Sequence, residues 1–460
     1  MACSSSTCNS SGCYKGYNEE ERKPTTRAAV NGRNSHQNLC VKCKSNEPIC
    51  CGIDRDDAKF CRDCFKTNIY GKFKQAVTYN AMITPSDKVL VAFSGGPSSR
   101  VVLQFVHEMQ YRAQRNYDAS KDKSLPVFGV GVAFVDESSI HSFSSQEIEK
   151  AIEDIRSIVS NLAPPSKELY VVPIENIFSS DGFDGKERLK KLLDAVSDDT
   201  GKEDLLIHLQ LLLLQKVASE NGYTRVVLGS CTSRIACHVI SATVKGQGYS
   251  LSADIQYVDS RWEIPVVLPL RDCSAQELNT LCGLDGLKIL ELLNGPRSGI
   301  NGLVSSFVKV LQEENPSREC TIVRTAGKLT PFHFNRIPEI HDSNVPLATR
   351  RRQKRHSLKP NGSLSSESFC PICNSPLDKS NLSSSLSSLG SHQNSDILAA
   401  ACCSSCQFQI LPKEPSLLEQ FVSLLPQPLI TKANHGDQGD FSLLREQIQD
   451  FLLSDGEDEN

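Results

Sequence analysis

The sequence predicts an α/β protein with a doubly wound parallel sheet, flanked by cysteine-rich modules near both ends of the chain. Residues 84–310 alternate strand-like and helix-like runs, which is the pattern of a parallel sheet with crossover helices. The first apolar run, residues 88–93, leads directly into a Ser-Gly-Gly turn, as expected where a strand turns sharply into a helix. Pairs of Cys-x-x-Cys stand on either side of this region.

Individual elements can be placed within the alternating region. Strands are predicted from apolar and β-branched runs at residues 88–93, 126–135, 169–173, 225–229 and 262–270. A helix is predicted at residues 99–115, because its apolar residues fall roughly on one face. Another helix at about 203–220 is expected to stop near Asn221-Gly222, a typical helix C-terminus.

Length and composition favour a cytosolic protein of two or three domains. The chain has 460 residues, of which 39% are hydrophobic, and a formal net charge of −4. This charge excludes a uniformly basic RNA-binding surface, so any RNA contact needs a local patch. The longest apolar stretch, residues 205–214, is interrupted by His208 and Gln210 and is too short to span a membrane. No secretory signal is visible, so the nineteen cysteines are interpreted as thiols and metal ligands.

Composition divides the chain into six segments. These are a polar, disordered tail (1–36), a zinc-binding module (37–80), the α/β domain (84–340), a basic and Ser-rich linker (343–369), a second Cys-x-x-Cys module with a low-complexity insert (370–412), and a helical segment with an acidic tail (413–460). The linker holds a basic run at 350–355, which is interpreted as a solvated spacer, a nuclear address or an RNA contact. A helix is expected at residues 441–453.

Two groups of cysteines have the spacing of metal ligands. Cys40 and Cys43 precede Cys61 and Cys64, and two such knuckles suit one tetrahedral, structural Zn²⁺. Two further cysteines lie between these knuckles and could replace a ligand: Cys50 and Cys51. The second group combines four cysteines across a low-complexity insert that can loop out cheaply: Cys370, Cys373, Cys403 and Cys406. It predicts a second zinc ribbon, with unpaired cytosolic thiols as the alternative.

The Ser-Gly-Gly turn predicts a phosphate-binding loop. Its glycines allow a close approach of the backbone, and the following helix N-terminus favours an anion. The sequence has no Walker A motif, so the common P-loop is excluded. The residues of the predicted nucleotide loop are Ser94, Gly95, Gly96, Ser98 and Ser99.

The loop resembles that of the PP-loop ATP-α-hydrolases, usually Ser-Gly-Gly-x-Asp-Ser, which adenylate a carbonyl oxygen and release pyrophosphate. With the cysteine groups before and after the sheet, and with Asp136-Glu137 after the second strand, the chain resembles the cytoplasmic tRNA 2-thiolation protein 2 family. That resemblance implies cytosolic 2-thiolation of the wobble uridine (mcm5s2U) in tRNAs for Lys, Glu and Gln. It also implies a heterodimer with a catalytic subunit, which adenylates the carbonyl oxygen at C2 of the uridine using ATP and Mg²⁺. Sulfur then arrives as a thiocarboxylate on a ubiquitin-like carrier and displaces AMP.

Three departures from the catalytic subunits favour a noncatalytic role. Ser98 stands where those enzymes have Asp, which removes a charge near Mg²⁺ and pyrophosphate. No cysteine lies between Asp136 and Arg225, where those enzymes carry a Cys-x-x-Cys. The turn after the fourth strand, residues 228–234, lacks their Asn/Asp-rich character and contains Cys231.

Sulfur transfer needs a thiolate, and Cys231 is the candidate because ligands bind at the carboxyl ends of central strands. A small buried apolar residue is the alternative interpretation of Cys231. The other cysteines of the sheet region are Cys237, Cys273, Cys282 and Cys320.

The leading hypothesis is therefore a noncatalytic subunit that provides tRNA-binding surface and stability to a catalytic partner. The candidate phosphate contacts, each also explicable as an ordinary surface charge, are Lys66, Lys72, Lys74, Lys186, Arg188, Lys190 and Lys191. One alternative is an active ATP-dependent tRNA sulfurtransferase that tolerates Ser98. The other is a zinc-ribbon scaffold with a vestigial nucleotide loop and no RNA role.

Overall fold

The structure is a computed structural model, and it describes residues 39–51, 59–121, 123, 126–140, 144–178, 185–290, 299–335, 368–377 and 394–435. Several predicted features lie outside the described residues: the tail at 1–36, the basic run at 350–355, most of the insert at 379–396, and the helix and acidic tail at 441–460. None of the described helices is long and apolar enough to cross a membrane.

The central sheet of the described chain has six strands in the order β5-β4-β3-β6-β8-β7. Its strands are β3 (Lys88–Ala92), β4 (Gly129–Asp136), β5 (Glu168–Pro173), β6 (Arg225–Val227), β7 (Val258–Asp259) and β8 (Val266–Val267). Strands β5, β4, β3, β6 and β8 run parallel, and β7 pairs antiparallel with β8 at one edge. The order of strands along the chain reverses between β3 and β6, which makes their carboxyl ends the topological switch point of the sheet.

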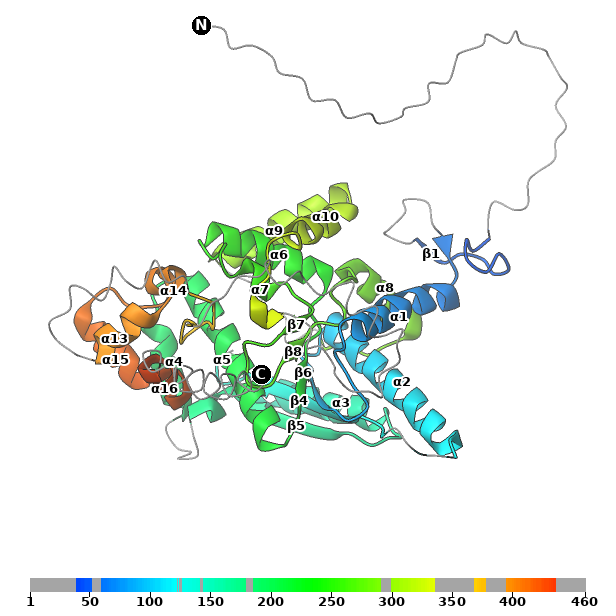
Figure 1. Cartoon of the computed structure of the whole chain (residues 1–460), viewed down its shortest axis with the longest axis horizontal. Helices are drawn as coiled ribbons and strands as arrows, with labels where there is room; N and C mark the ends of the chain where they lie inside the picture. Colours follow the sequence, from blue (N-terminus) through cyan, green and yellow to red (C-terminus); the bar gives the residue numbers. More distant parts are fainter. Residues whose placement is uncertain are drawn as a thin grey trace, which may run out of the picture.

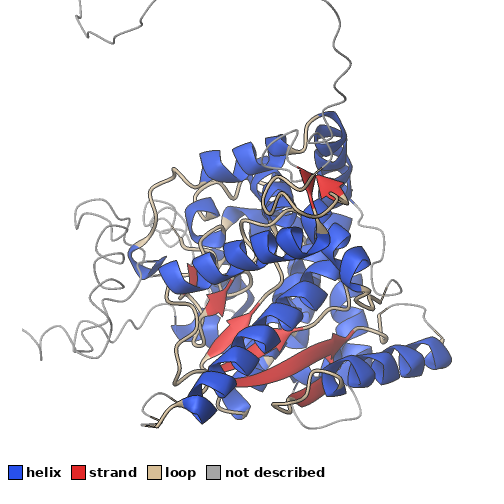
Figure 2. Ribbon diagram, turned by 90° about the vertical axis from the view of Figure 1, so that its right-hand side faces the viewer, coloured by secondary structure: helices blue, strands red, loops and turns tan. Residues whose placement is uncertain are grey.

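Helices cover both faces of the sheet (Figure 2). Alternation along β3 shows why: Val89 and Val91 enter one core, and Leu90 enters the other. The first core includes α1 (Arg62–Tyr79), α2 (Pro97–Ala119), α3 (Ser145–Ser160) and α8 (Ala275–Asp285). The second core includes η1 (Ile174–Phe178), α4 (Gly185–Asp194), α5 (Asp199–Glu220), α6 (Thr232–Val244) and α7 (Leu251–Asp254). The prediction of a doubly wound α/β fold is confirmed.

The remaining elements lie around this sheet. The first cysteine group surrounds a small hairpin: Cys40 and Cys43 lie in the segment before β1 (Cys50–Cys51), Cys61 directly follows β2 (Lys59–Phe60), and Cys64 lies in the first turn of α1. Helices α9 (Gly299–Glu314) and α10 (Ser317–Ala326) pack with α6, followed by η3 (His333–Asn335). The C-terminal helices α13 (Asn394–Ala401), α14 (Ser404–Gln409), α15 (Pro415–Leu424) and α16 (Gln427–His435) lie beside α4 and α5 (Figure 1). Their apolar side chains join the second core.

Local sequence signals account for the ends of the main helices. Pro97 occupies the first turn of α2, where a missing amide hydrogen costs nothing. Helix α5 ends where predicted, with Gly222 at φ +67° beyond the C-cap Asn221. Helix α8 begins with a capping box in which the side chains of Ser274 and Glu277 each accept from the other residue's backbone amide.

The predicted strand at 262–270 was too long. Only Val266–Val267 forms β8, because both backbone polar groups of Ile264 are hydrogen-bonded to the Gln215 side chain. This side chain donates to the Ile264 carbonyl at 2.9 Å and accepts from the Ile264 amide at 3.1 Å. A residue bonded in this way is not paired to a neighbouring strand. The short edge strand β7 was not predicted, since two residues leave no periodic pattern.

Candidate functional site

The predicted nucleotide loop connects β3 to α2 at the switch point. Gly95 adopts φ +80°, a left-handed conformation that strains other residues, and Gly96 is the N-cap of α2. The Ser99 hydroxyl donates to the carbonyl of Gly96 at 2.8 Å, and the Ser94 hydroxyl lies 3.3 Å from it. The loop is thus closed by its own serines at the start of a 23-residue helix, whose N-terminus favours an anion.

Two other segments pack against this loop. The backbone amide of Leu290 donates to the carbonyl of Gly95 at 2.9 Å, and a Cβ on Gly95 would lie 2.9 Å from the Leu290 Cβ. On the other side, a Cβ on Gly229 would lie 2.8 Å from the backbone nitrogen of Ser99. Glycine is therefore required at both loops of the switch point, where β3 and β6 end.

A cleft of about 1860 Å³ opens at the carboxyl ends of the strands. Its lining includes loop residues Ser94, Gly96, Ser98 and Ser99, and Cys231 from the turn after β6. Helices α4, α5, α6 and α9 provide further walls. Position 98 presents a hydroxyl to this cleft, where the ATP-α-hydrolase pattern has a carboxylate, so the loop has less negative charge with which to hold a divalent cation.

The cysteines of the sheet region differ in their surroundings. Cys231 is the N-cap of α6 and 4% exposed, so it touches the cleft while packing in the apolar core with Cys273 and Cys282. Burial raises the pKa of Cys273 well above its usual value. Burial also raises the pKa of Cys282 to about 11, although the positive charge of nearby Arg100 partly lowers it. The thiols of Cys273 and Cys282 are therefore protonated at neutral pH and are poor nucleophiles.

Two further cysteines lie on helices around the cleft. Cys237, on α6, is half-buried and belongs to the cleft lining. Cys320 lies half-buried on α10, which packs against α6.

The first cysteine group meets the geometric requirement for one metal ion. The sulfur atoms of Cys40, Cys43, Cys61 and Cys64 all lie within 4.8 Å of one another. The Sγ atoms of Cys43 and Cys61 are 3.8 Å apart, about the edge of a tetrahedron with metal–sulfur bonds of about 2.3 Å. The side chains of Cys50 and Cys51 lie outside the described residues.

The pKa values of the thiols in this group also favour a bound cation. Burial opposes ionisation of Cys40, but backbone amides of neighbouring residues lower its pKa to about 6. Burial and the adjacent thiols raise the pKa of Cys64 to about 12. The Cys64 thiol therefore stays protonated at neutral pH unless a positive ion lies among the four sulfur atoms.

The second cysteine group forms the same arrangement. Cys370, Cys373, Cys403 and Cys406 come together within 4.8 Å across the insert, with 3.6 Å between the sulfurs of Cys373 and Cys403. Burial opposes ionisation of Cys370, yet hydrogen bonds from neighbouring thiols lower its pKa well below its usual value. We refer to these two groups of four ligands as the N-terminal and C-terminal cysteine centres. Both fit a metal ion.

Four of the predicted phosphate contacts are engaged within the chain, among them Lys191, which lies 4.0 Å from Glu187 on the surface of α4. Lys66 lies 2.6 Å from Asp285 and Lys72 lies 2.8 Å from Glu277, and both pairs join α1 to α8. The Arg188 guanidinium donates to three carbonyls at the end of α15, those of Ser423, Leu424 and Leu425. Lys186 and Lys190, in contrast, lie in the cleft lining.

Sequence reasoning missed a buried polar group on the cleft wall. Lys245 lies 2.6 Å from Asp204, and the Asn301 amide lies 3.0 Å from the other oxygen of the same carboxylate. The side chains of Lys245 and Asp204 are 4% and 11% exposed. Burial lowers the pKa of nearby His208, which keeps that imidazole neutral. The available signal was the polar residue His208 within the apolar run at 205–214, because it shares one face of α5 with Asp204, four residues earlier.

Together the fold and site define a class: a doubly wound α/β protein with a Ser-Gly-Gly loop at its switch point and two cysteine centres. A family profile described as cytoplasmic tRNA 2-thiolation protein 2 matches residues 299–409. The protein of that name from Arabidopsis thaliana is 61% identical over 455 residues, covering 98% of this chain and 99% of the relative. The human one is 27% identical, covering 65% and 68%. The chain therefore belongs to the cytoplasmic tRNA 2-thiolation protein 2 family.

Among solved structures, the chain is similar to the U34-tRNA thiolase NcsA from Methanococcus maripaludis with its [4Fe-4S] cluster. The TM-score is 0.47 at 16% identity, with 64% of this chain and 88% of the thiolase covered.

Proposed function

We propose that this chain is a noncatalytic subunit of a cytosolic complex that 2-thiolates the wobble uridine of tRNAs for Lys, Glu and Gln. In this proposal it forms a heterodimer with a catalytic thiolase subunit. That partner adenylates the uridine with ATP and Mg²⁺ and receives sulfur from a ubiquitin-like carrier. Membership of the tRNA 2-thiolation family supports the reaction and the compartment.

The composition of the cleft is the observation that carries the noncatalytic role. Thiolation needs a group that binds the metal and pyrophosphate, and a thiolate that passes on sulfur. This cleft presents Ser98 at the position of the acid. Cys231 is largely covered by the core, and the chain has no cysteine from residue 137 to 224. These features favour a helper over a catalyst.

The positive role would be to hold tRNA and support the partner. Lys186 and Lys190 line the cleft from α4, where they could contact phosphates, and Lys74 lies on α1, the helix that begins at the N-terminal cysteine centre. Each cysteine centre would hold a structural Zn²⁺, because four thiolates complete a tetrahedral shell and leave no open position for substrate. Zinc there would supply folding energy to the module that it closes.

Reconstitution tests this proposal. The purified chain, its catalytic partner and the two together are each given tRNA, MgATP and a sulfur donor, and 2-thiouridine is measured by mass spectrometry of digested tRNA. We expect product only with the pair, and co-purification of the two subunits. Product from this chain alone would contradict the proposal and identify an active sulfurtransferase.

A cellular experiment addresses the scaffold alternative. Deletion of the gene should abolish 2-thiouridine at the wobble position and leave the catalytic partner inactive. Normal 2-thiouridine in the deletion strain would exclude a role in thiolation. It would leave a zinc-containing scaffold with a vestigial loop as the remaining interpretation.

A further inference from the structure

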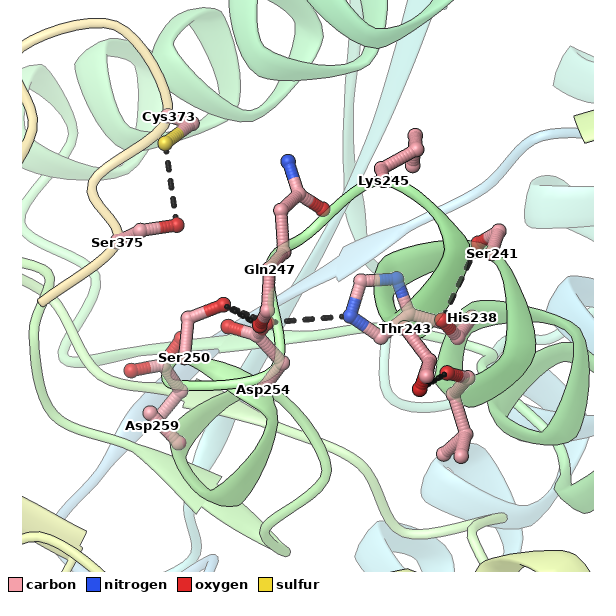
Figure 3. A network of polar contacts seen from close by, with 12 residues as sticks. His238, Ser241, Thr243, Lys245, Gln247, Ser250, Asp254, Asp259, Cys373 and Ser375 are labelled. Atoms are coloured by element: carbon pink, nitrogen blue, oxygen red, sulfur yellow. Dashed lines mark hydrogen bonds and ion pairs between the residues drawn. The ribbon is translucent and has the colours of Figure 1, made fainter. Parts of the chain in front are cut away.

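The C-terminal cysteine centre lies at the wall of the cleft. Cys373 and Ser375 belong to the cleft lining, as do Asp254 and His238 of the sheet domain. Figure 3 shows these side chains approaching from two parts of the chain, with Cys373 and Ser375 on one segment and His238 on another. The Sγ of Cys373 lies 3.1 Å from the Ser375 hydroxyl. A metal centre predicted from local spacing thus borders the site formed at the switch point.

A reciprocal pair of hydrogen bonds joins this centre to the sheet domain. The Arg261 guanidinium donates to the carbonyl of Asn374 at 3.3 Å, and the Asn374 amide donates to the carbonyl of Arg261 at 3.3 Å. Asn374 directly follows the ligand Cys373, is 4% exposed, and adopts φ +56°, which asparagine tolerates better than most residues. We call Arg261 and Asn374 the clasp.

The clasp continues into the cleft through charged groups. Arg261 lies 2.7 Å from Asp254 and 2.7 Å from Asp259, and its side chain is 6% exposed. Burial alone would raise the pKa of Asp254, but Arg261 and His238 lower it below its usual range, so the carboxylate is charged. Its second oxygen lies 3.2 Å from Nε2 of His238, on α6 (Figure 3).

Helix α6 carries His238, and its N-cap is Cys231 at the switch point, so this helix links the charged groups to the floor of the cleft. A path of direct contacts therefore runs from a metal ligand, Cys373, to the turn that faces the nucleotide loop. Buried ion pairs of this kind have one favourable arrangement, and removal of one partner leaves an uncompensated charge.

We propose that metal binding at the C-terminal cysteine centre is coupled, through the clasp, to the order of the cleft wall formed by α6 and residues 251–261. Without the metal, four thiols no longer hold the turn that positions the Asn374 carbonyl. Arg261 then loses an acceptor, and the arrangement of Asp254, Asp259 and His238 around it loses one of its supports. Because such coupling is reciprocal, a ligand that binds the cleft and orders this wall also raises the affinity of the C-terminal cysteine centre for metal.

The N-terminal cysteine centre provides an internal control. Its cysteines lie in the segment before β1, directly after β2 and in the first turn of α1. Its neighbours Arg62 and Lys66 pair with Asp285 on α8, on the other face of the sheet. Loss of its metal should leave the wall unaffected.

Hydrogen–deuterium exchange of the full-length, zinc-loaded chain tests the coupling without tRNA or a partner. Cys403→Ser removes one ligand of the C-terminal centre, and Cys43→Ser removes one ligand of the N-terminal centre. We expect peptides from residues 232–261 to exchange faster in C403S and at the wild-type rate in C43S. Peptides from α2 should be unchanged in C403S. Unchanged exchange at 232–261 in C403S would overturn the proposal.

The clasp is tested by the rate of zinc release to a chelator. Release from the C-terminal centre is measured in a C43S background, and release from the N-terminal centre is measured in a C403S background, so that each chain holds one zinc site. Arg261→Gln should release zinc from the C-terminal centre about 10- to 100-fold faster, the range for residues that support metal ligands. Asn374→Gly keeps the left-handed turn and the backbone carbonyl at this position but removes the hydrogen bond from the side-chain amide to Arg261. It therefore provides a folded variant in which zinc release should be accelerated less than in R261Q. Arg318→Gln, at an exposed helical pair, is the matched control. Wild-type release rates in both clasp variants would overturn the proposal.

Discussion

The backbone at Gly229 lies so close to that of Ser99 that a Cβ added to the glycine would be only 2.8 Å from the Ser99 backbone nitrogen. This contact joins the turn after β6 to the first turn of α2. It brings the two central loops of a doubly wound sheet together at the place where such folds bind ligands. The shape of the cleft floor therefore depends on a residue without a side chain.

Gly229→Ala should accordingly destabilise the protein by about 1–3 kcal/mol, the usual cost of forcing extra atoms into a packed site. The clash is with backbone, so no side chain can rotate away from it. Urea unfolding of the full-length chain measures the change. Gly248→Ala, where a Cβ would meet nothing within 4 Å, should change stability by less than about 0.5 kcal/mol.

Metal content should follow the two cysteine centres independently. The purified chain is expected to hold about two Zn²⁺, and Cys43→Ser or Cys403→Ser should each lower this to about one. Elemental analysis with quantified protein provides the measurement. Cys231→Ser, outside both centres, should retain both ions. A C43S chain with undiminished zinc would show that Cys43 is not a ligand.

Lys245→Met should cost about 3–5 kcal/mol, because it leaves the buried Asp204 carboxylate with only the Asn301 amide as a strong partner. Replacing both charged residues, as in D204L/K245M, should recover part of this loss, since no uncompensated charge remains. Lys191→Met removes an exposed pair with Glu187 at 4.0 Å and should cost less than about 0.5 kcal/mol. Equal effects of K245M and K191M would contradict the interpretation.

Acid should weaken the contact between α2 and the residues before β5 through His107. Burial, Lys167 and Arg100 lower the pKa of His107 to about 4, from 6.5 for a free histidine. Between pH 6.5 and 4 the unfolded chain therefore binds a proton that the folded chain does not, so stability falls as pH falls through this window. Urea midpoints at pH 7 and pH 5 measure the loss. It should shrink in H107Q and persist in H333Q, a variant at an exposed histidine.

Local patterns were sufficient for the parts of this protein whose structure is set by neighbouring residues. The apolar run before Ser94 predicted β3, and the Ser-Gly-Gly turn predicted the loop that enters α2, because both depend on side-chain alternation and glycine conformation. The knuckle spacing predicted both cysteine groups, since two residues between ligands suit one tetrahedral ion. Strand lengths were predicted less well. The strand predicted at 262–270 is shorter because the Gln215 side chain, on α5, hydrogen-bonds the backbone carbonyl and amide of Ile264.

Long-range contacts decided the rest. The reciprocal bonds of Arg261 and Asn374 join residues 113 positions apart, and the Arg188 bonds to α15 span more than 230. No local pattern encodes which distant carbonyl a guanidinium will reach. By itself, the sequence determined the fold class, the loop and the membership of the two cysteine groups. Only the tertiary structure showed that the C-terminal cysteine centre borders the cleft, because that position results from packing α13–α16 into the core beside α4 and α5.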